Sequence, residues 1–173
     1  GLLGPHGTGA LWVRSGVTLA PLRQGGTGSV SESMFQPRMM PDSLESGTLN
    51  LPGIAGLKAG MRFALAHRRE AHETTAALCG MMREALQNMT NVRVYTKAGA
   101  SLLSFNVEGL ASQVVAAALD EQEIAVRGGL HCAPGTHRFL GTLNIGAVRV
   151  SPGLMNTAAD AKRLIDAVWR IAK

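Results

Sequence analysis

Two runs of apolar residues in the middle of the chain recur every three or four positions, which is the spacing of one face of an α-helix. This pattern predicts two consecutive helices, over about 53–68 and 69–88. The residues that define them are Leu57, Met61, Ala64 and Leu65, and then Leu78, Met81, Met82, Ala85 and Leu86.

Shorter apolar stretches follow these helices and are typical of strands, because they span only four to six residues and contain many β-branched side chains. They cover 92–95, 102–107, 124–127 and 147–151. A helix from Ser112 to Leu119 separates the two pairs, and a last helix with Asn156 or Thr157 as its N-cap closes the chain. The order helix, strand, strand, helix, strand, strand, helix predicts an α+β layer, a small sheet with helices on one face.

The first third of the chain has a different character. Gly, Pro, Ser and Thr interrupt residues 1–56, and the segment 10–14 is the one clear strand candidate. We therefore interpret 1–56 as the C-terminal edge of a larger domain, and 57–173 as a small α+β domain.

Composition supports a chain that buries a core, since 46% of its 173 residues are hydrophobic. Aromatic residues make up only 4%, and 21 residues are glycine, about 12% where roughly 7% is usual. This profile suits an enzyme whose backbone bends tightly around a ligand, or a piece of a larger protein.

Several classes of protein are not expected. No window approaches 18 uninterrupted apolar residues, so we expect no membrane span, and the start shows no signal peptide. The net charge of +5 is spread along the chain without interleaved aromatic residues, so nucleic acid is not an expected partner. Cys79 and Cys132 lie far apart without metal-ligand spacing, so we expect no zinc or other metal site, and a cytoplasmic location.

The segment 127–134, Arg-Gly-Gly-Leu-His-Cys-Ala-Pro, is the most informative for chemistry. A cysteine in a Gly-rich, Pro-bounded loop beside Arg127 and His131 can be exposed, and positive charge near it favours the nucleophilic thiolate. The alternative is that Cys132 is a small buried residue, as free cysteines often are. Cys79 lies among Ala76, Ala77 and Leu78 on a helix, so we expect it in the core.

Arg127 and Arg149 interrupt apolar stretches, and burying either without an anion would be costly. A guanidinium group matches a carboxylate with two hydrogen bonds, so the pair would suit an amino-acid substrate. Pairing with Asp or Glu residues of the chain itself is the alternative. The segments 25–29 and 45–50 offer backbone N–H groups and hydroxyls that suit phosphate, although ordinary turns would have the same composition.

These segments, in this order, resemble the cysteine desulfurase branch of the class V, pyridoxal phosphate-dependent aminotransferases. The resemblance covers essentially the whole chain and rests on residues 1–9, 25–29, 45–50, 127–134, and 148–151 followed by 156–157. It implies fold type I of the pyridoxal phosphate-dependent transferases, with the C-terminal small domain and the end of the large domain present here. It also implies conversion of L-cysteine to L-alanine, a homodimer with shared active sites, and a sulfur-acceptor protein as partner.

Site residues follow from the same resemblance. Cys132 matches the cysteine that takes up sulfur as a persulfide, and Arg149 is a stronger match than Arg127 for holding the substrate carboxylate. Thr48 matches a threonine that reaches the cofactor phosphate of the partner subunit, and Gly25 and Gly26 match a loop bordering that shared site.

One departure from the family pattern concerns the cofactor lysine. The family places a His-Lys pair immediately before the motif that begins at Gly1, and none of Lys58, Lys97, Lys162 and Lys173 falls at that position. We therefore expect the 173 residues alone to be inactive. A selenocysteine lyase, a related class V aminotransferase and a non-catalytic sulfur-transfer interaction module are the alternatives, although the His131-Cys132 pair argues against the aminotransferase.

Overall fold

A computed structural model describes residues 2–173. The chain forms two compact units, Gly1–Ala66 and His67–Lys173, each of which is described here by itself. The division lies ten residues beyond the boundary expected between 56 and 57. None of the helices within 2–173 is both long and apolar enough to span a membrane.

The first unit has one regular element among its described residues, the helix α1 (Leu51–Ala66). The chain's beginning packs tightly on this helix, because a Cβ at Gly60 would lie 2.6 Å from the carbonyl oxygen of Leu2. The strand expected at 10–14 is wrong: this segment has no strand partner, and Trp12 is 81% exposed. A strand needs a neighbour to satisfy its backbone groups, and none lies beside it among the described residues.

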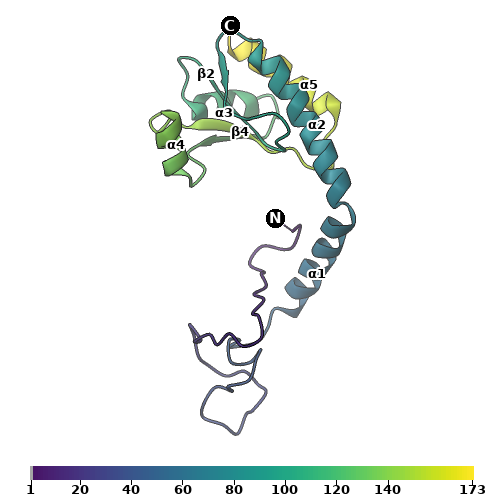
Figure 1. Cartoon of the computed structure of the whole chain (residues 1–173), viewed down its shortest axis with the longest axis vertical. Helices are drawn as coiled ribbons and strands as arrows, with labels where there is room; N and C mark the ends of the chain where they lie inside the picture. The colour runs from purple at the N-terminus through teal and green to yellow at the C-terminus, as the bar shows by residue number, and fades with distance from the viewer. Residues whose placement is uncertain (1) are drawn as a thin grey trace. The chain divides into compact units, whose positions relative to one another are not determined.

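The second unit contains a four-stranded antiparallel sheet with the order β1-β2-β4-β3. Its two middle strands, β2 and β4, are labelled in Figure 1. Its strands are β1 (Val92–Val94), β2 (Leu103–Val107), β3 (Arg127–Gly129) and β4 (Ala147–Val150). The sheet was expected, but the third strand is displaced: it begins at Arg127, where the prediction ended. Ile124 and Val126 instead pack against the hydrophobic core as irregular chain, which explains their apolar character.

Three helices cover one face of this sheet, as predicted. They are α2 (Arg68–Gln87), α3 (Ser112–Asp120) and α5 (Ala158–Ile171), and α2 and α5 lie against each other (Figure 1). Leu103 and Phe105 of β2 and Val148 of β4 point into the core and are completely buried. Truncating a buried Phe or Leu to Ala costs about 2–5 kcal/mol, so this face holds the unit together.

A short helix, α4 (Pro134–Leu140), follows the cysteine loop, between two strands where the predicted order of elements has no helix. Pro134 occupies its first turn, where a missing N–H costs nothing, and Gly141 ends it in a left-handed conformation with φ of 71°. Both residues are visible in the sequence as start and stop markers, but seven residues are too few to show helical periodicity.

Candidate functional site

The two arginines predicted to act on substrate meet on neighbouring strands. In the antiparallel register of β3 and β4, Arg127 pairs with Arg149, and in that of β2 and β4, Ser104 pairs with Arg149. Because Val148 and Val150 point into the core, the alternation along β4 places Arg149 on the opposite face. Ser104, Arg149 and Arg127 therefore form a row across three strands.

Within residues 2–173, no carboxylate forms an ion pair with Arg127 or Arg149. The ion pairs Arg69–Glu73 and Lys162–Asp166 are formed by other side chains. The Nε atom of Arg149 is buried and lacks a hydrogen-bond partner in the described chain. A buried donor without an acceptor is costly, and a carboxylate would satisfy it in the bidentate geometry that guanidinium favours. The internal pairing considered from the sequence is thus not observed in the described chain.

Cys132 is presented to solvent on a strained turn. His131 and Cys132 both have positive φ, 52° and 57°, and the N–H of Ala133 donates to the carbonyl of Leu130 at 2.9 Å. The left-handed conformation costs a non-glycine residue roughly 1–2 kcal/mol. Cys132 is exposed, so packing in the core is not its role.

Cys79 lies in the core, as predicted, and so differs from the exposed Cys132. It is 2% exposed within α2, and burial raises the pKa of its thiol. A buried, protonated thiol is a poor nucleophile. The two cysteines of the chain therefore have separate roles, one in packing and one at an accessible loop.

His131 links the cysteine loop to the arginine strand. Its Nε2 lies 2.9 Å from the carbonyl oxygen of Ala147, and since a carbonyl only accepts, Nε2 carries the proton. Burial lowers the pKa of His131, the hydrogen bond to Ala147 raises it, and the electrostatic interactions with Arg149, His137 and Arg127 lower it further. The ring is therefore mainly neutral at pH 7 and adds no positive charge next to Cys132.

A second histidine supports the same loop. His137 of α4 is buried, its Nδ1 lies 2.8 Å from the hydroxyl oxygen of Thr142, and its ring centroid lies 5.8 Å from that of His131. The Nδ1 of His131 is buried without a hydrogen-bond partner in the described chain. The sequence carries no signal for the role of His137, because only the turn after α4 brings Thr142 back to it.

The phosphate-binding candidates lie in the first unit. The N–H of Gly47 donates to the carbonyl of Gly26 at 2.8 Å, so the two glycine-containing segments lie side by side, and the N–H of Gly25 donates to Oε1 of Gln36 at 3.1 Å. Thr48 is exposed, and its hydroxyl bonds to no other described residue. Among the three predicted cofactor-binding residues, Thr48 and Gly26 thus keep a donor available for a phosphate, the Thr48 hydroxyl and the Gly26 N–H.

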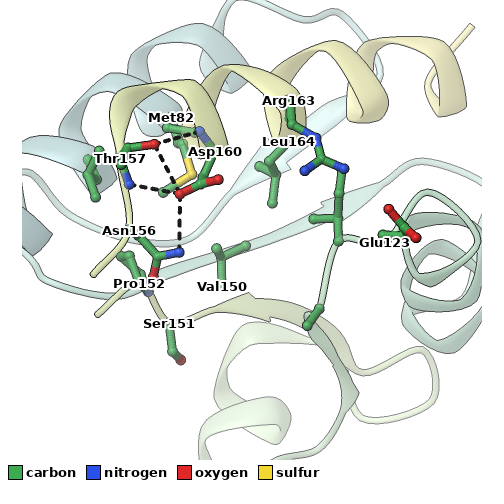
Figure 2. Close-up of a pocket in the computed structure, with 14 residues that line it drawn as sticks. Met82, Glu123, Val150, Ser151, Pro152, Asn156, Thr157, Asp160, Arg163 and Leu164 are labelled. Atoms are coloured by element: carbon green, nitrogen blue, oxygen red, sulfur yellow. Dashed lines mark hydrogen bonds between the residues drawn. The ribbon is translucent and has the colours of Figure 1, made fainter. Parts of the chain in front are cut away.

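The second unit also contains a cavity of about 250 Å³ (Figure 2). Neither the arginine row nor Cys132 lines it. Of its two acidic residues, Glu123 and Asp160, the second is already engaged, because its Oδ2 accepts from the N–H and hydroxyl of Thr157 and from Asn156. These bonds, the one to the Thr157 N–H foremost, lower the pKa of Asp160. Thr157, one of the two predicted candidates, is the N-cap of α5, so the Asp160 carboxylate serves the start of this helix.

Comparison with known proteins places this geometry in context. The profile of the family described as "Aminotransferase class-V" matches residues 2–164. The chain is similar to a probable cysteine desulfurase of Pseudomonas putida, with 36% identity over 96% of the chain, and to the cysteine desulfurase CsdA of Escherichia coli, with 31% identity over 98%. It spans 42% and 43% of the length of these two relatives.

Solved structures resemble the chain as well. The crystal structure of Escherichia coli cysteine desulfurase CsdA superposes with a TM-score of 0.78 at 29% identity, covering 87% of this chain and 38% of that one. The apo structure of a cysteine desulfurase from Thermococcus onnurineus gives a TM-score of 0.71 at 25% identity, covering 90% of this chain and 38% of that one. The fold expected from the sequence is therefore confirmed.

Proposed function

Since this chain belongs to the aminotransferase class-V family, we propose that it forms the cysteine-bearing part of a pyridoxal phosphate-dependent cysteine desulfurase, with L-cysteine as substrate and L-alanine as product. The names of its relatives support this proposal. The observation that carries it is that Cys132 is exposed on a strained loop. Its neighbour His131 has its pKa lowered by two arginines without an ion-pair partner, Arg149 and Arg127.

The arginines bind the substrate in this proposal. Arg149 takes the substrate carboxylate, because its half-buried guanidinium holds an unsatisfied Nε, and Arg127, exposed on the edge strand, adds positive charge. Together they orient the substrate so that its sulfur faces Cys132. Holding two reacting groups in the right geometry is itself a large source of rate enhancement.

Cys132 then takes the sulfur. Its sulfur forms a new S–S bond as the C–S bond of the substrate breaks, and the bonding electrons stay with the substrate carbon, which gains a proton to give alanine. The enzyme thiol becomes a persulfide, so no outside oxidant or reductant is consumed. A sulfur-acceptor protein, a homodimer with shared sites and a cytoplasmic location complete the proposal.

Pyridoxal phosphate, when bound, supplies an electron-withdrawing ring that makes cleavage of the C–S bond feasible. The residues present fit its phosphate, because the Thr48 hydroxyl and the Gly26 N–H are donors without a partner in the described chain. We assign the anchoring lysine to none of the four in this sequence; Lys162 pairs with Asp166 at 2.7 Å, and Lys173 lies over the Trp169 ring. The 173 residues alone are accordingly inactive in this proposal, and cofactor absorbance is lost on desalting.

The test is turnover of L-cysteine by the complete enzyme that carries these residues, followed as alanine and persulfide. Cys132→Ala should abolish persulfide formation and retain cofactor absorbance, whereas Cys79→Ala, the matched control, should turn over normally. Normal turnover by Cys132→Ala would refute its role as nucleophile. Activity with selenocysteine and none with cysteine would favour a selenocysteine lyase, and activity with neither would favour an interaction module.

A further inference from the structure

Ser112 is a buried residue whose hydroxyl both donates and accepts a hydrogen bond. It is 1% exposed at the start of α3, and its Oγ donates to the carbonyl of Ile145 at 2.7 Å while accepting from the N–H of Gly129 at 3.0 Å. Its own N–H also donates to Ile145, at 3.0 Å. Oε1 of Gln113 lies farther from the hydroxyl, at 3.2 Å, so the single proton goes to Ile145.

The two backbone groups held by this hydroxyl belong to the two segments that carry the chemistry. Gly129 is the last residue of β3 and leads into the loop with Cys132, and Ile145 leads into β4 with Arg149. Ser112 itself belongs to neither segment. One side chain on a third element therefore connects the start of the nucleophile loop to the start of the arginine strand.

Both segments approach Ser112 closely. A Cβ at Gly146 would lie 2.5 Å from Oγ of Ser112, and a Cβ at Gly128 would lie 2.5 Å from its carbonyl oxygen. Real Cβ atoms do not approach other heavy atoms so closely, so both segments are packed against Ser112 as tightly as backbone allows.

The strand that leads to Cys132 cannot fix its own register. β3 has three residues, lies at the edge of the sheet and pairs with β4 alone. Two of its residues, Gly128 and Gly129, have no side chain that could lock the pairing, and register is weakly specified in glycine-rich strands. Such a strand needs a contact from outside the sheet to fix its position, and the hydrogen bond from the Gly129 N–H to the Ser112 hydroxyl provides one.

We propose that Ser112 is a positioning residue that fixes where the Cys132 loop lies relative to Arg149 on β4. The proposal rests on the proposed function insofar as Cys132 and Arg149 act on one substrate. The hydrogen bond from His131 Nε2 to Ala147 then holds the loop at a second point nearer the thiol.

The first experiment tests this position by comparing the rates at which two reagents of different charge alkylate Cys132. Iodoacetate carries a carboxylate and iodoacetamide does not, so the ratio of their rates at Cys132 reports how well the arginines face the thiol, independent of the thiolate fraction. In the wild-type chain this ratio should exceed that of glutathione by about threefold, in line with a partly exposed charge interaction. Ser112→Ala should return the ratio to the glutathione value.

Thr75→Ala is the matched control. It also removes a buried hydroxyl, one that donates to Ala71 within α2 at 2.7 Å, but it touches neither segment. The control should leave the ratio unchanged even where it lowers stability as much as Ser112→Ala. An equal loss of the ratio in both variants would overturn the proposal, because it would mean that general loosening is the cause.

The second experiment follows amide hydrogen exchange at Gly129. In the wild-type chain this amide should be protected as strongly as the amides of β4, and rapid exchange would overturn the proposal without any variant. Ser112→Ala should accelerate exchange at Gly129 about tenfold or more, since the loss of one hydrogen bond exposes this amide to local opening. A wild-type alkylation ratio equal to that of glutathione would contradict the carboxylate-binding part of the proposed function, while exchange at Gly129 would still decide the role of Ser112.

Discussion

Arg127 and Arg149 face each other across the β3–β4 ladder, although both side chains are positively charged. Like charges directly opposite each other on a sheet are destabilising. No acidic side chain of the described residues pairs with either of them. The fold therefore maintains an unfavourable pair at the place where an anionic substrate is proposed to bind.

Removing one of the two charges should stabilise the chain. We expect Arg127→Gln to raise the free energy of unfolding by about 0.5 kcal/mol at low salt, because cross-strand charge pairs are worth roughly 0.2–1 kcal/mol. The gain should disappear in 1 M salt, where the screening length is about 3 Å. Urea unfolding at two salt concentrations measures it, and a loss of stability at low salt would show that Arg127 has a favourable partner instead.

Substrate binding should depend on Arg149 more than on Arg127. In the complete enzyme, Arg149→Ala should raise the KM for L-cysteine about tenfold or more, because a hydrogen bond to a charged group contributes roughly 1.5–3 kcal/mol. Cofactor absorbance should change little. Arg127→Ala should have a smaller effect, since this side chain is exposed. An unchanged KM in Arg149→Ala, with a raised KM in Arg127→Ala, would reverse the assignment.

Gly146 should tolerate no side chain. It has φ of 66°, and a Cβ would lie 2.5 Å from Ser112 Oγ and 2.8 Å from the Cα of Gly129. We expect Gly146→Ala to cost about 3 kcal/mol or more, from backbone strain and overpacking together. Gly99→Ala is the control, because Gly99 has φ of 80° with open space around it and should cost only about 1 kcal/mol. Equal losses of unfolding free energy in the two variants would mean that the close approach contributes nothing.

His131 should make stability fall as the solution becomes mildly acidic. Its folded-state pKa is below the ordinary value of 6.5, so below pH 6.5 the unfolded chain binds a proton that the folded chain resists. His131→Gln keeps a donor for Ala147 and does not titrate. Wild type should therefore lose stability relative to this variant between pH 7 and 5, as measured by thermal unfolding, and a gain over that window would contradict the lowered pKa.

Asp160 should have the opposite pH dependence. Its folded-state pKa is below the ordinary value of 3.8, so its contribution is fully present above that value and is lost as pH falls through the folded pKa. Asp160→Asn should lower the melting temperature at pH 7, and the difference from wild type should vanish in strong acid. A difference that persists at pH 2 would assign the effect to packing at the start of α5.

The main elements of the second unit could be predicted because residues close together in the sequence determine each of them. The buried faces of α2 and α5 show in apolar spacing, and Thr157 is a capping residue by its chemistry. The start of β3 could not be placed, because Ile124 and Val126 are as apolar as strand residues and only the pairing with β4 distinguishes them. The strand expected at 10–14 failed for the same reason.

The candidate site was predictable in part. Cys132, Arg127 and Arg149 stand out by residue type, but their relation to one another depends on the antiparallel register of two strands that are far apart in sequence. Ser112 could be identified only as a helix start, since its partners Gly129 and Ile145 are backbone groups. A hydrogen bond between a side chain and a distant backbone leaves no pattern in the sequence.

The strand order β1-β2-β4-β3 also determines when the candidate site can form during translation, because β3 pairs with a strand that is made after it. Cys132 leaves the ribosome before Ile145, Ala147 and Arg149, yet the Ser112 hydroxyl and His131 Nε2 both bond to carbonyl groups of that later segment. Until residues 145–149 have been made, the nascent chain carries its exposed thiol on a loop without these anchors and without Arg149. Cys132 and the groups proposed to act with it are therefore completed together, late in the translation of this unit.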